Sequence, residues 1–293
     1  MKSNNPVFAR SEEFNGQGNA YGNQTYPGGG QSYPGYGQAP QSPYGDPSQW
    51  GTGTTTPQET GQRMTIDSVV QKTALTLAVV IATAAATWFW TGDLSVEGAG
   101  KLYLALLVGS GAAFILSMVN SFKRVISPAL VLVFAAAEGV ALGAFSKFID
   151  AQFVQEAGLG SNIVLQAVVG TFAAFAGTLA AYKILNIRVG QKFRTFVVAA
   201  MFGMVALGLL ELVLSFFGSQ IGFFGFGGLG LIFAIVGLVL GVFMLILDFD
   251  FVENGVRAGL PERESWRAAF GLTVSLVWIY TNLLRILAIF NQE

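Results

Sequence analysis

The stretch that decides the fold is residues 218–247, with the sequence GSQIGFFGFGGLGLIFAIVGLVLGVFMLIL. It contains no Asp, Glu, Lys or Arg. A helix rises about 1.5 Å per residue, so about 20 apolar residues cross a bilayer core that is about 30 Å thick. Residues 227–247 are therefore expected to form a membrane-spanning helix.

Six further apolar stretches of similar length lie on either side of this one, at about residues 73–90, 102–119, 128–146, 163–182, 195–217 and 268–290. Strands of a membrane barrel would be about ten residues long and would alternate in polarity, which these stretches do not. Helices are the expected form, because all their backbone hydrogen bonds lie within the segment. The sequence predicts an all-α integral membrane protein, a seven-transmembrane helix bundle over residues 65–293 in contact with the lipid bilayer.

The composition excludes several classes of protein. Hydrophobic residues make up 53% of the 293 residues and charged residues 11%, against about 25% charged residues in an average soluble domain. The chain has no Cys and no His, which removes disulfides, thiolate nucleophiles, Ser-His-Asp triads and His-ligated metals. We therefore expect no enzyme activity and no cofactor. The net charge of −1 gives no sign of a nucleic-acid partner.

Residues 1–64 have a different composition from the rest of the chain. They hold seven of the nine prolines and five of the eight tyrosines, and they are rich in Gly. Such a segment cannot bury enough apolar surface to offset the entropy of ordering it. We expect a disordered amino-terminal tail, which is either simply solvated or docks on other proteins.

Lys and Arg in the short loops predict the orientation, since cytoplasmic loops carry an excess of basic residues. With the amino terminus in the cytoplasm, the inside segments carry eleven Lys and Arg. The outside loops then carry only Lys101 and Lys147. After seven spans, the carboxyl terminus is expected outside.

An ionisable side chain inside the bilayer costs at least about 2.5–3.5 kcal/mol, so it is a candidate functional group. Glu138 lies near the middle of the third stretch. It is expected to face the bundle interior or a cavity, either as a pH-sensing group or as a protonated structural carboxyl bonded to a neighbouring helix. In a chain without His, carboxyl groups are the expected sensors of protons.

Asp248 and Asp250 directly follow the uncharged window. Residues two apart point in nearly opposite directions on a helix, so we expect Asp248 to face the bundle and Asp250 to lie nearer water. The alternative is two solvated acids at a helix end, a position that the helix dipole disfavours. Together with Glu138 they are candidate groups for ion binding or pH sensing. Calcium, which prefers oxygen ligands, is the candidate ion, although no metal site is certain.

Glu211 and Arg285 lie at similar depths in the outer third of their stretches. An ion pair between them would neutralise both charges. The long stem of Arg285 would alternatively let its guanidinium reach the outer surface. Asn282 is the polar neighbour of Arg285, one helical turn earlier on the same face.

Two GxxxG patterns, at 139–143 and at 237–241, lie within the third and sixth stretches. Small residues at this spacing let helix backbones approach closely. Because Gly is also common in membrane helices generally, each pattern is either a tight helix contact or part of that background.

Three segments together resemble the Bax inhibitor-1/YccA family: EGVALG at 138–143, LDFDFVE at 247–253 and LVWIYTNLLRIL at 276–287. The resemblance covers about residues 64–293 and leaves the tail outside it. It implies a bacterial plasma-membrane protein whose seven helices surround the last one. It also implies a calcium leak gated by protons, in which an aspartate of the sixth helix and one of the seventh hold the pore shut.

The sixth-helix aspartate corresponds to Asp248. Its seventh-helix partner is expected near Ile279, but no acid occurs between residues 268 and 290, and the polar side chains nearby are Thr281 and Asn282. Two functions follow as hypotheses. The first is a pH-sensitive cation leak channel, or a regulator of ion homeostasis. The second is a non-conducting interaction protein that modulates other membrane machinery, such as a membrane protease.

Overall fold

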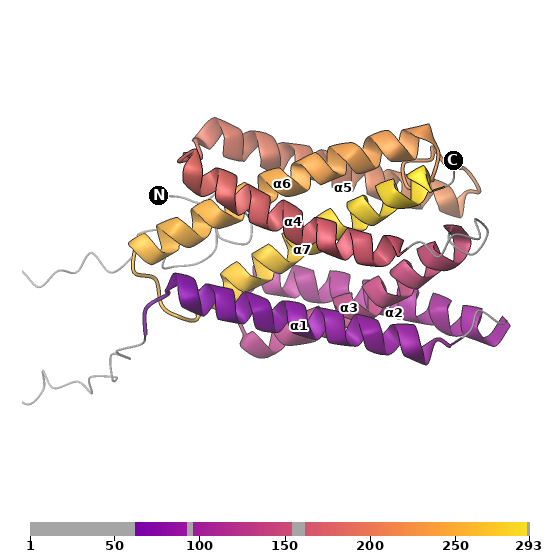
Figure 1. Ribbon diagram of the computed structural model, residues 1–293, viewed down its shortest axis with the longest axis horizontal. Helices are drawn as coiled ribbons and strands as arrows, with labels where there is room; N and C mark the ends of the chain where they lie inside the picture. The colour runs from indigo at the N-terminus through magenta and orange to yellow at the C-terminus, as the bar shows by residue number, and fades with distance from the viewer. Residues whose placement is uncertain (1–61, 93–95, 154–161, 292–293) are drawn as a thin grey trace, which may run out of the picture.

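The chain folds as a bundle of long helices (Figure 1). A computed structural model describes residues 62–92, 96–153 and 162–291. Within these ranges the regular elements are seven helices, each long and apolar enough to cross a membrane. They are α1 (Ile66–Trp90), α2 (Val96–Phe122), α3 (Pro128–Phe153), α4 (Ile163–Ile184), α5 (Gln191–Phe216), α6 (Gly228–Arg257) and α7 (Glu264–Phe290). The prediction of a seven-helix membrane protein is confirmed. The expected tail, up to residue 61, and the carboxyl-terminal residue lie outside the described residues.

Local sequence signals place the beginnings of two helices. Thr65 caps α1, because its hydroxyl accepts a hydrogen bond from the backbone of Ser68 while the Ser68 hydroxyl accepts one from the backbone of Thr65. This reciprocal pair satisfies donors that the first turn leaves open. Pro128 is the first residue of α3, a position where its fixed backbone angle suits the helix and no hydrogen bond is lost.

The last helix is the centre of the bundle. In Figure 1, α7 runs diagonally between α4 on one side and α1 with α3 on the other. It packs against α1, α3, α4 and α6, and its hydrophobic window is the most buried of the seven. By contrast, α2 packs mainly on α3, and α5 packs mainly on α6. The central position implied for the last helix is therefore confirmed.

Both GxxxG patterns mark tight helix contacts. A Cβ atom on Gly143 would collide with the Ala84 backbone of α1, and one on Gly139 with the Thr83 side chain there. The second pattern faces α7. A Cβ on Gly237 would lie 2.5 Å from the amide oxygen of Asn282, and one on Gly241 would press on Ile279. These glycines set the spacing between the helices that form the core.

The sixth helix is longer than the sequence suggested. It continues ten residues past 247 and ends at Arg257. Asp248 and Asp250 therefore lie inside the helix, well before its last turn, and the alternative of two solvated acids at a helix end is wrong. Within the helix both carboxyls have partners on neighbouring helices, as described below.

The segment before α1 is attached to the loop between α6 and α7. The backbone N–H of Met64 donates to the Leu260 carbonyl at 2.7 Å, and the N–H of Glu262 donates to the Gln62 carbonyl at 2.8 Å. The Met64 side chain is buried against Gly255 and Leu260. The start of the described chain is thereby fixed to the same end of the bundle as the start of α7.

Candidate functional site

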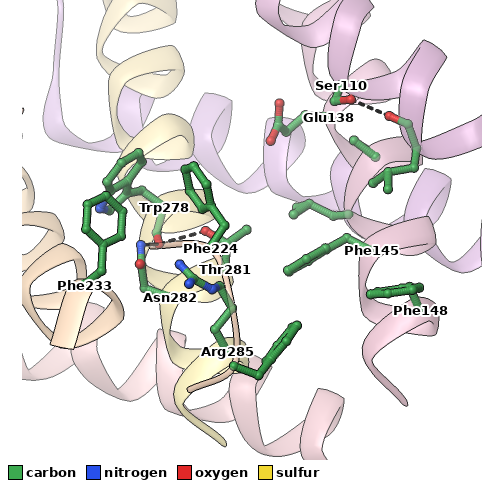
Figure 2. A pocket seen from close by; sticks show the side chains of 14 residues that line it. Ser110, Glu138, Phe145, Phe148, Phe224, Phe233, Trp278, Thr281, Asn282 and Arg285 are labelled. Carbon is green, nitrogen blue, oxygen red and sulfur yellow. Dashed lines mark hydrogen bonds between the residues drawn. The ribbon is translucent and has the colours of Figure 1, made fainter. Parts of the chain in front are cut away.

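A cavity of about 410 Å³ opens beside the central helix. Four helices, α2, α3, α6 and α7, contribute to its wall together with the loop between α5 and α6. Most of the wall is apolar, and the polar or charged residues in it are Ser110, Glu138, Trp278, Thr281, Asn282 and Arg285. Three residues selected from the sequence, on two different helices, thus face one space (Figure 2).

Glu138 lies on the α3 side of this cavity, next to Ser110 of α2 (Figure 2). The expectation that it faces a cavity is met by the geometry. The Ser110 hydroxyl donates to the Leu106 carbonyl of its own helix rather than to the carboxyl. No hydrogen bond to the Glu138 carboxyl is formed within the described ranges. The alternative of a carboxyl bonded to a neighbouring helix therefore finds no partner there.

Arg285 and Glu211 do not form the ion pair that we considered. The Arg285 Nη2 donates to the Phe223 carbonyl at 2.7 Å and more weakly to the Gly225 carbonyl at 3.4 Å. Glu211 accepts hydrogen bonds from the backbone N–H groups of Ile221 and Gly222, at 3.2 and 2.9 Å. Both side chains bind backbone groups of the α5–α6 loop instead of each other. Arg285 is only 6% exposed, so it does not extend to the surface either.

Asp248 is buried against the central helix. The Ser275 hydroxyl of α7 donates to its carboxylate at 2.5 Å. The expectation that Asp248 faces the bundle agrees with this contact. The expected position of its partner, near Ile279, is wrong by one helical turn. Ile279 is fully buried and packs under Gly241, whereas Ser275, four residues earlier, is the residue opposite Asp248.

Asp250 points to the other neighbour of α6. It forms an ion pair with Arg194 of α5, with the Arg194 Nη2 2.6 Å from its carboxylate. Asp250 was expected nearer water, but it is 9% exposed against 7% for Asp248. The two acids thus face different helices as their spacing requires. What separates them is the partner: a neutral hydroxyl for Asp248 and a guanidinium for Asp250.

The three acids do not converge on one ion. Glu138 faces the cavity, Asp248 contacts α7 and Asp250 contacts α5. Among the described residues, no group of three or more acidic, His or Cys side chains lies close enough to hold a metal. A joint calcium site made of these three carboxyls is therefore ruled out for this arrangement.

One face of α7 connects the Asp248 contact with the cavity. Ser275, Trp278, Asn282 and Arg285 are spaced three or four residues apart, so they form one stripe along the helix. The Trp278 indole donates to the Gly237 carbonyl at 2.8 Å, and Asn282 lies over the same glycine. We call these four residues the polar stripe. The sequence analysis selected Asn282 and Arg285 and did not select Ser275 and Trp278. The spacing of three or four residues between these positions could have indicated all four.

Comparison with known protein families gives a match over nearly the whole chain. A family model described as "Bax inhibitor 1 like" matches residues 5–292 of this chain. The match begins near the amino terminus, so the view that the resemblance stops before the tail is wrong. A search of the curated proteins found no match.

Proposed function

Because the chain belongs to the Bax inhibitor 1 like family, we propose that it forms a cation leak pathway along the polar stripe of α7. Calcium is the proposed ion and the plasma membrane the proposed site. The observation that carries the proposal is the continuity of the stripe: the cavity lies at its Arg285 end, and the buried Asp248–Ser275 contact lies at its other end. In this proposal the described arrangement is closed, and α7 must shift against α6 to open it.

Two acidic side chains and one basic side chain lie along the polar stripe, and they act on a passing cation in opposite ways. Glu138 is the acid that faces the cavity, and Asp248 is the acid at the contact below it. Arg285 lies at the outer end, where its guanidinium is bonded to loop carbonyls. A cation would therefore pass a positive group at the mouth and two carboxyls deeper in, which favours a slow leak over a rapid channel.

Flux through purified protein in liposomes tests this proposal. We expect the wild-type protein to release calcium slowly, and Ser275→Ala to increase the rate because the hydroxyl that closes the path is gone. Asp248→Asn is expected to change both the rate and its pH dependence. The matched control is Asp250→Asn, which loses a partner on α5 and leaves the α6–α7 contact intact. Equal effects of the two Asn variants, or no effect at Asp248, would reject the assignment.

Glu138 is the proposed pH-sensing group within the cavity. It shares the cavity with one other charged side chain, Arg285, among the lining residues. Loss of its proton places a negative charge there, which must be balanced by a cation, water or a helix movement. Glu138→Gln cannot lose that proton, so we expect it to flatten the pH response of the leak. A pH profile identical to the wild type would leave Glu138 without this role.

A second function has one observation in its favour. The carboxyl of Asp248 faces a neutral serine instead of a second acid, so the pair of aspartates implied for a proton-gated leak is absent from this contact. A non-conducting protein that binds and modulates other membrane machinery would not need that pair. Liposomes that release no calcium at any pH, with correctly folded protein, would favour this second function.

A further inference from the structure

Arg285 carries a charge that the described residues do not neutralise. Its hydrogen bonds go to two backbone carbonyls, at Phe223 and Gly225, and no carboxylate forms an ion pair with it within the described ranges. Its Nε is buried and has no hydrogen-bond partner. An unpaired donor on a buried guanidinium is costly unless an anion or another acceptor meets it.

The guanidinium faces the cavity. Figure 2 shows it close to Thr281, Phe224 and Asn282, and it lines the same cavity as Glu138. The Phe224 ring lies against it, with its centroid 5.4 Å from the central guanidinium carbon. The remaining walls are largely aromatic, with Phe145, Phe148, Phe226, Phe233 and Trp278. One buried cation therefore stands at the end of a space lined by apolar rings.

The cavity is accessible from outside the bundle. Phe148 and Phe224 border it and are 39% and 51% exposed. Phe148 belongs to a membrane-spanning helix, so its exposed surface faces lipid or the outer edge of the bilayer. The volume of about 410 Å³ is within the range of about 300–1,000 Å³ that small-molecule sites occupy. It has room for one acyl chain and not for the two chains of a phospholipid.

From these observations we propose that the cavity binds a single-chain anionic lipid, a long-chain fatty acid. Its carboxylate accepts a hydrogen bond from the Arg285 guanidinium, and its chain lies along the aromatic wall past Trp278. A charged carboxylate is recognised by the guanidinium through a charge-assisted hydrogen bond. Glu138 lies on the α3 side of the cavity, away from the guanidinium, and is not part of the recognition. The proposal concerns binding and does not depend on ion conduction.

A fatty acid brominated on its chain is the probe, because bromine near Trp278 quenches the indole fluorescence. The purified full-length chain in a neutral detergent is titrated with this acid and, separately, with its methyl ester. We expect saturable quenching by the acid at roughly tenfold or more lower concentration than by the ester, the effect of one hydrogen bond to a charged group. Trp278→Phe is expected to remove the saturable part. Equal quenching by acid and ester would overturn the proposal.

Three variants test which side chains the preference for the acid over the ester depends on. Arg285→Met should abolish the preference for the acid, whereas Arg188→Gln, an exposed arginine in the α4–α5 loop, should leave it unchanged. Glu138→Gln should not weaken binding of the acid, and a loss of binding in this variant would overturn the choice of ligand. If Arg285→Met does not fold, the comparison of acid with ester on the wild-type protein still decides the question. A calcium flux that is absent while acid binding is present would reject the proposed function alone.

Discussion

Gly143 shows how little space single residues leave in this bundle. A Cβ atom on it would meet the carbonyl oxygen and the Cα of Ala84 in α1, which are backbone atoms that cannot rotate away. Close approach of this kind replaces the hydrophobic effect as the source of helix association in lipid, because lipid chains are as apolar as the side chains. The glycine is therefore required at this position.

At the residue scale we predict that Gly143→Ala destabilises the fold. The α1–α3 pair must move apart to admit the methyl group, and overpacking of this type costs about 1–3 kcal/mol. Gly177→Ala in α4 is the matched control, because a Cβ atom there meets nothing within 4 Å. Thermal unfolding of both variants in the same detergent measures the difference. Equal melting temperatures for the two variants would contradict the prediction.

At the scale of elements, the first turn of α7 is fixed by a buried ionic cluster. Arg267 is fully buried, and its Nε donates to the Glu264 carboxylate at 2.7 Å. Its Nη2 also donates to the Arg124 carbonyl, in the loop between α2 and α3, at 2.7 Å. One guanidinium thus connects the central helix to a peripheral loop at the end of the bundle where Lys72 pairs with Glu262.

We predict that Arg267→Ala lowers the free energy of unfolding by about 3–5 kcal/mol, because it leaves the Glu264 carboxylate buried without this partner. The double variant Arg267→Met with Glu264→Gln should recover part of the loss, since neither side chain is then charged. Chemical or thermal unfolding of the three proteins supplies the comparison. Arg257→Ala is the control, because its ion pair with Glu253 is largely exposed and such pairs contribute about 0–1 kcal/mol. If Arg267→Ala lowers the free energy of unfolding no more than Arg257→Ala does, the predicted role of the buried pair is refuted.

At the scale of the whole molecule, the basic residues that set the predicted orientation gather at one end of the bundle. Contacts at that end join α1 to the α6–α7 loop through Lys72 and Glu262, and α5 to α6 through Arg194 and Asp250. At the opposite end, Lys147 donates to the carbonyls of Trp88 and Gly92 where α1 finishes. An end rich in Lys and Arg is the end expected in the cytoplasm.

We therefore predict that the α4–α5 loop is cytoplasmic and the α5–α6 loop is outside. The chain has no Cys, so one cysteine can be introduced at a time without a background signal. On intact cells, an impermeant thiol reagent should label Ser219→Cys and should label Gly190→Cys only after the membrane is opened. Both positions are exposed in the fold, so access is limited by the membrane alone. Labelling at position 190 on intact cells would show that the α4–α5 loop is outside and that the predicted orientation is wrong.

The sequence by itself determined the class of fold. The uncharged stretch 218–247 and the six other apolar stretches are long and apolar enough to predict seven spans. The bilayer determines the length and polarity of every helix that crosses it. It also selected Glu138, Asp248 and Arg285, since a charged residue in an apolar span is conspicuous without any structure. These properties depend on each segment alone.

The tertiary structure decided which of these residues meet. Sequence spacing gives the face of α7, but Ser275 and Ile279 share that face, and their axial separation is about 6 Å. Which of them lies opposite Asp248 depends on how far α7 slides along α6, and the close packing of Asn282 and Ile279 over Gly237 and Gly241 sets that position. In the same way, the loop carbonyls that bind Arg285 are 60 and 62 residues away in the chain, and only the packing of the bundle brings them to it.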